Sequence, residues 1–135
     1  MPDLVQQKIL KILEDSLTDL AAKNSSAALR KAGDLRDLVL LTQDADEVLW
    51  LLWATVFHAY FSIDAALSEY TIPPEYYERV LKNISTKIGD LKRAVAEHRS
   101  EVAYVTLRDL ALSATDFAYE AGYNAWDKPK RKDDE

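Results

Sequence analysis

Apolar residues recur every three or four positions along most of the chain, and no long stretch alternates apolar and polar residues with a period of two. Spacings of three and four place side chains on one face of an α-helix, whereas a half-buried strand needs strict alternation. Short connections between long helices make consecutive helices antiparallel. We therefore predict an all-α fold, an antiparallel bundle of four to five long helices. The helices are expected at about residues 2–23, 26–42, 45–70, 74–98 and 101–121.

The last two predicted helices carry the clearest apolar faces. In the segment 74–98, steps of four and three are typical of a bundle seam, formed by Tyr77, Leu81, Ile84, Ile88, Leu91 and Val95. The inward set of the last helix is Ala103, Leu107, Leu110, Ala114, Phe117 and Ala121. Its polar stripe comprises Thr106, Asp109, Ser113, Asp116 and Glu120. We expect this stripe to face solvent and to bind no metal, because carboxylates along one helix lack the enclosure that metal affinity needs.

Breaks in the apolar pattern coincide with residues that favour helix ends. The run Asn24-Ser25-Ser26 offers an N-cap. Asp44 followed by Glu47 resembles a capping box at the start of the third helix. Pro73 ends that helix, because residues before proline avoid the helical region. Gly122 is expected to stop the last helix.

The third predicted helix contains the most apolar run, residues 48–63, with sixteen residues, no charge and one histidine. A membrane-spanning helix needs about 20 such residues, and acidic residues lie close to both ends of this run. We therefore expect the central helix of a soluble bundle, buried on most sides, and no membrane span. Its candidates for a protein interface or a ligand pocket are Trp50, Trp53, Phe57, His58, Tyr60 and Phe61.

His58 is the polar break in this run and has two interpretations. A histidine can change its charge near neutral pH, so His58 could act as a ligand or a general base. We favour a packed histidine that makes one hydrogen bond. The run 48–63 also has more apolar perimeter than the other helices of a small bundle can cover. We therefore expect a second copy of the chain to cover the remainder, which predicts a homodimer.

Length and composition bound the class of protein. A chain of 135 residues fits one domain, which we place at 1–126, followed by a polar and disordered tail at 127–135. The absence of cysteine excludes disulfides and thiolate metal sites. The chain opens with Met1-Pro2-Asp3 and has no basic-then-apolar leader, so we expect a cytoplasmic protein. Abundant charged residues with few asparagines and glutamines favour a thermophilic source.

Charge and histidine spacing exclude several further functions. The net charge of −6 argues against nucleic-acid binding, since such proteins usually carry a basic face. The basic run Lys128–Lys132 is followed directly by three acidic residues, which cancel much of its charge. Neither histidine has a glutamate three residues before it, as a di-iron bundle needs. We therefore predict no metal and no cofactor.

Arg93 and His98 form an Arg-x4-His motif. This motif resembles the short motif of the HEPN superfamily, whose members are small all-α bundles, many of them dimeric ribonucleases. The resemblance covers six residues, together with fold class and size. It implies a general acid or base at His98 and a phosphate-holding role for Arg93.

Three functional hypotheses remain. The leading one is a non-enzymatic helical-bundle protein that acts through protein–protein contacts, as a homodimer or with another protein. The alternative is a HEPN-like, metal-independent ribonuclease that uses Arg93 and His98. The third is a small-ligand binder that uses the region between Trp50 and Phe57.

Overall fold

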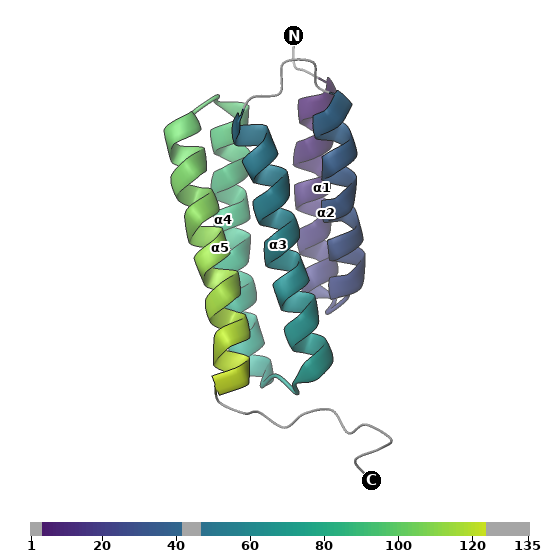
Figure 1. Cartoon of the computed structure of the whole chain (residues 1–135), viewed down its shortest axis with the longest axis vertical. Coiled ribbons are helices and arrows are strands. Elements are labelled where there is room, and N and C mark those ends of the chain that lie inside the picture. The colour runs from purple at the N-terminus through teal and green to yellow at the C-terminus, as the bar shows by residue number, and fades with distance from the viewer. Residues whose placement is uncertain (1–3, 42–46, 124–135) are drawn as a thin grey trace.

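A computed structural model of the chain describes residues 4–41 and 47–123 (Figure 1). These residues form helices and short connections and contain no strand, which confirms the predicted all-α bundle. The helices are α1 (Leu4–Ala21), α2 (Ser25–Leu41), α3 (Glu47–Glu69), α4 (Pro74–Ala96) and α5 (Ser100–Tyr123). The predicted capping residue Asp44 and the predicted tail at 127–135 lie outside the described residues.

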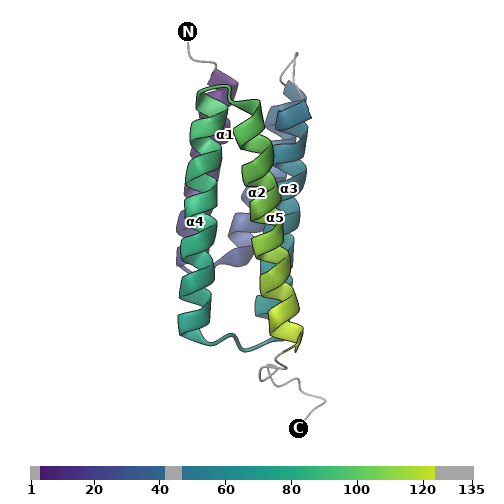
Figure 2. The same cartoon turned by 90° about the vertical axis from the view of Figure 1, so that its left-hand side faces the viewer.

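The five helices form a closed ring in the order α1, α2, α3, α5, α4 (Figures 1 and 2). Helix α3 packs between α2 and α5, and α5 packs between α3 and α4. Although α3 and α4 are consecutive in the chain, these two helices do not contact each other. The link of Tyr70 to Pro73 therefore crosses the end of the ring. As a result α3 and α5 are neighbours that run in the same direction, although consecutive helices are antiparallel as predicted.

The core lies inside the ring, and the periodicity of the sequence identifies much of it. All six inward residues predicted for α5 are buried, and in α4 the predicted seam is buried except for half-buried Leu81. Helix α2 is continuous through Gly33, where an added Cβ would meet no atom within 4 Å. Its buried stripe is Ala28, Ala32, Leu35 and Val39. The small residues on this stripe allow α2 to lie close against α1 and α3.

Two predictions about α5 are wrong. Its polar stripe does not face solvent throughout: Thr106 is buried, Asp109 lies 3.7 Å from Lys87, and Ser113 accepts a hydrogen bond from Asn83 at 3.1 Å. The contacts of Asp109 and Ser113 place the middle of this stripe at the boundary with α4, whereas Asp116 and Glu120 are exposed. The helix also continues past Gly122 to Tyr123.

A buried hydrogen bond between side chains joins α1 to α3 in the core. Ser16 Oγ donates to the carbonyl oxygen of Leu13 at 2.7 Å, which uses its only proton. The Tyr60 hydroxyl therefore donates to Ser16 Oγ, also at 2.7 Å. Both side chains are almost fully buried. This contact satisfies both buried hydroxyl groups.

Tyr60 should make stability fall at high pH. Burial raises the pKa of Tyr60 to about 12, because a phenolate in the core would lose its hydration. The folded chain thus holds this proton more tightly than the unfolded chain, whose tyrosines have a pKa near 10. The resulting stabilisation is complete below about pH 10 and disappears as the pH rises through 12. We expect the free energy of unfolding to lose about 2–3 kcal/mol over this range from Tyr60 alone.

Urea titrations of wild type and Tyr60→Phe at several pH values test this expectation. Lysines and other tyrosines titrate in both proteins, so the difference between the two curves isolates Tyr60. The stability of wild type relative to Tyr60→Phe should fall as the pH rises from about 10 to 12. Parallel curves would contradict a buried, un-ionised Tyr60.

Two helices end in the same left-handed turn. After α1, Lys23 has φ 60°, and after α4, His98 has φ 55°. In the second turn His98 N–H bonds to the Val95 carbonyl and Arg99 N–H bonds to the Ala94 carbonyl. The first turn has the same two bonds, a pattern known as the Schellman motif. Such turns favour glycine, because other residues are strained at positive φ.

Glycine at these two positions should stabilise the fold. We expect His98→Gly and Lys23→Gly each to raise the free energy of unfolding by about 0.5–1 kcal/mol, measured by urea denaturation. The matched control is Lys82→Gly, at an exposed position inside α4, which should lower it by up to about 1 kcal/mol. Destabilisation by all three glycines would contradict the left-handed turns.

Candidate functional site

The outward side of α3 is apolar. Helix α3 packs only against α2 and α5, so no described helix covers its third side. The exposed positions between Glu47 and Asp64 carry no charge, and the stripe spans Trp50, Leu51, Ala54, Phe57, His58, Phe61 and Ala65. The prediction of a helix buried on most sides is therefore wrong, because a ring of five leaves one side of each helix open.

The length and composition of α3 also match those of a membrane-crossing helix, the only such match among the described helices. Within the bundle, 33% of its most apolar window is buried. Core helices of soluble proteins meet the same two criteria, so this match is weak evidence of a membrane span.

The six sequence candidates on α3 divide between two environments. Trp50, Phe57, His58 and Phe61 are exposed, and Phe61 is the most open of the three aromatic residues, at 54%. Tyr60 is 0% exposed and belongs to the core, which corrects its assignment to an interface. The four exposed residues share the outward stripe.

Trp53 is intermediate between these environments. It packs partly against the core, and its indole meets the Trp50 ring edge-on, with centroids 6.4 Å apart. Its buried Nε1–H has no hydrogen-bond partner among the described residues. The exposed aromatic surface at Trp50 therefore continues into the half-buried ring of Trp53.

His58 lies in the middle of the outward stripe. It is exposed, so the interpretation of a packed core histidine is wrong. Its backbone carbonyl accepts a hydrogen bond from Ser62 Oγ at 3.0 Å. No group of three or more metal-binding side chains occurs among the described residues. His58 is therefore a polar position within an apolar surface.

Helix α5 carries a second outward apolar stripe, which the sequence analysis missed. Val105, Leu112 and Tyr119 are all exposed and recur at intervals of seven, close to two helical turns. Arg108 lies between the first two of them and is also exposed. The spacing of seven in the sequence is the signal for this apolar stripe. The prediction places the polar stripe of the same helix on the solvent side instead.

Helices α3 and α5 pack directly on each other, and each carries one of these exposed apolar stripes. We call this combined surface the α3–α5 face; it comprises Trp50, Leu51, Phe57, Phe61, Val105, Leu112 and Tyr119. Monomeric proteins rarely expose contiguous apolar patches above about a few hundred Å². Protein interfaces are enriched in aromatic residues. The composition of the α3–α5 face is thus typical of a contact surface.

Arg93 and His98, the pair of the HEPN-like motif, lie at the C-terminal end of α4 and are both exposed. The Arg93 guanidinium binds the Asp90 carboxylate one turn earlier. His98 occupies the left-handed turn after the helix. Among the described residues, no hydrogen bond or ion pair joins Arg93 to His98. The turn alone accounts for the position of His98.

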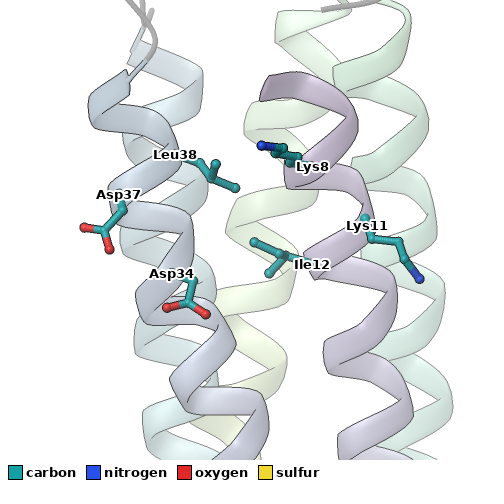
Figure 3. Close-up of a pocket in the computed structure, with 6 residues that line it drawn as sticks. All are labelled: Lys8, Lys11, Ile12, Asp34, Asp37 and Leu38. Atoms are coloured by element: carbon teal, nitrogen blue, oxygen red, sulfur yellow. The ribbon is translucent and has the colours of Figure 1, made fainter. Parts of the chain in front are cut away.

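A hollow of about 360 Å³ lies between α1 and α2 (Figure 3). Lys8, Lys11 and Ile12 line it from α1, and Lys11 also pairs with Asp15 at 3.1 Å. Its α2 side is lined by Asp34, Asp37 and Leu38. None of the six α3 candidates lines this hollow. This hollow therefore does not support the hypothesis of a ligand pocket at the tryptophans.

A search of protein families, curated proteins and solved structures finds no match to this chain.

Proposed function

We propose that this protein acts through protein–protein contacts and that its first partner is a second copy of itself, bound through the α3–α5 face. The observation that supports the proposal is the uncovered, charge-free apolar stripe of α3. Removing such side chains from water is favourable by about 25 cal/mol per Å² of apolar area, which offsets part of the entropic cost of association.

Charge favours a self-contact through this stripe. The chain has a net charge of −6, so most arrangements of two copies bring acidic surfaces together. The exposed positions of α3 between Glu47 and Asp64 carry no charge. Two copies can therefore meet here without like-charge repulsion. The bundle provides a rigid support, because the opposite side of α3 is fixed in the core.

Oxidative footprinting of side chains over a dilution series tests this proposal. Phe57 and Phe61 should become protected as the protein concentration rises through the dissociation constant. Leu4 and Leu41 are exposed on α1 and α2 and serve as controls. Their reactivity should stay constant. Equal reactivity of the α3 residues at all concentrations up to high micromolar would contradict the proposal.

A further inference from the structure

On the outward side of α5, charged and apolar side chains lie at equal sequence distances before and after Leu112. Arg108 lies four residues before Leu112, and Asp116 lies four residues after it. Val105 and Tyr119 lie seven residues before and after. All five side chains are exposed. The three residues spaced by four form one ridge of the helix surface.

The two ends of this ridge carry opposite charge. Arg108 contacts the neighbouring carboxylate of Asp109 at 3.3 Å, an exposed pair of adjacent residues. Such pairs contribute little to stability, so the guanidinium is available to a partner. At the other end, burial raises the pKa of Tyr76, and the carboxylates of Glu120 and Asp116 raise it further against the opposing effect of Arg79. The region around Asp116 is therefore negative.

A two-fold axis at Leu112 would exchange these ends. In a symmetric dimer, residue i contacts residue j of the partner, and j contacts i. When ridges of four-residue spacing pack together, two helices cross at about −50°. For an antiparallel pair this crossing brings position 108 toward position 116 of the partner. Leu112 meets its own copy at the axis.

We propose that two copies dock with their α5 helices antiparallel about Leu112, so that Arg108 of each copy pairs with the partner's Asp116. The proposal rests on the self-association proposed above and specifies its orientation. A parallel arrangement would instead place Arg108 beside its own copy and Asp116 beside its own copy, with repulsion at both points. Because α3 adjoins α5, the α3 stripe lies at the margin of the same interface.

Charge reversal and its rescue test this orientation by sedimentation equilibrium. Arg108→Glu and Asp116→Arg should each weaken dimerisation by about tenfold or more, because each replaces two attractive contacts by repulsive ones. The double variant exchanges the charges and should return to within about threefold of wild type. Arg36→Glu, at an exposed position on α2, is the control for net charge and should have little effect.

The outcomes separate the orientation from the proposed function. A wild-type protein that stays monomeric at high micromolar concentration overturns both. If wild type dimerises and Leu112→Asp breaks the dimer, but the double variant is no tighter than the singles, the antiparallel orientation alone is wrong. Single variants that behave like Arg36→Glu also overturn it. Rescue by the double variant supports it, because the antiparallel arrangement makes these two positions reciprocal.

Discussion

Replacing Phe61 and Leu112 together by aspartate should make the protein monomeric without unfolding it. Both side chains are 54% exposed on the outer side of the ring, so neither substitution places a charge in the core. In the dimer the same charges would be buried against apolar groups, which is costly when they are unpaired. We expect the dissociation constant to rise by about 100-fold or more, measured by sedimentation equilibrium.

Leu40→Asp is the matched control for this double variant. Leu40 is 53% exposed, like the two target residues, but it lies on α2. It should leave the dissociation constant within about threefold of wild type, and circular dichroism should show unchanged helicity for all variants. A double variant that dimerises as tightly as wild type would rule out the α3–α5 face as the interface.

Phe117→Ala should have the largest effect on stability. Phe117 is 1% exposed and joins α5 to α4 through two aromatic contacts. Its ring stacks on Tyr76 with centroids 6.0 Å apart and meets Tyr77 edge-on at 6.5 Å. Truncation leaves a cavity that these rings cannot fill without moving. We expect a loss of about 3–5 kcal/mol in the free energy of unfolding, measured by urea denaturation.

Leu4→Ala serves as the control for this truncation. Leu4 is exposed at the start of α1, and its removal should change stability by less than about 0.5 kcal/mol. A loss below about 1 kcal/mol for Phe117→Ala would show that the α4–α5 boundary is not packed as described. The measurement should use dilute protein, so that dimerisation adds nothing to the apparent stability.

The faces of α4 and α5 that point inward could be predicted from sequence, because apolar residues at helical spacing on an otherwise polar helix define one direction. Helix α3 offered no such contrast. Tyr60 and Phe61 are adjacent and both aromatic, yet one is in the core and the other faces outward. Only the positions of α2 and α5 around α3 decide which of the two is covered.

The outer face of α5 was missed for a related reason. Either its polar stripe or its outward apolar stripe could face solvent, and periodicity alone does not show which one does. In the structure the middle of the polar stripe lies at the boundary with α4, where Asp109 contacts Lys87 and Ser113 contacts Asn83. Those contacts depend on α4 and α5 being neighbours. The order of the helices in the ring, which makes α3 and α5 parallel neighbours, likewise could not be predicted from the pattern within any one helix.

Absolute mass, measured by size-exclusion chromatography with light scattering, distinguishes a self-associating chain from a monomeric one. We expect a mass of twice the chain mass of 15.3 kDa at micromolar concentration, falling toward one chain mass on dilution. A mass of 15.3 kDa at every concentration up to several hundred micromolar would contradict self-association and, with it, the proposed orientation of the two α5 helices.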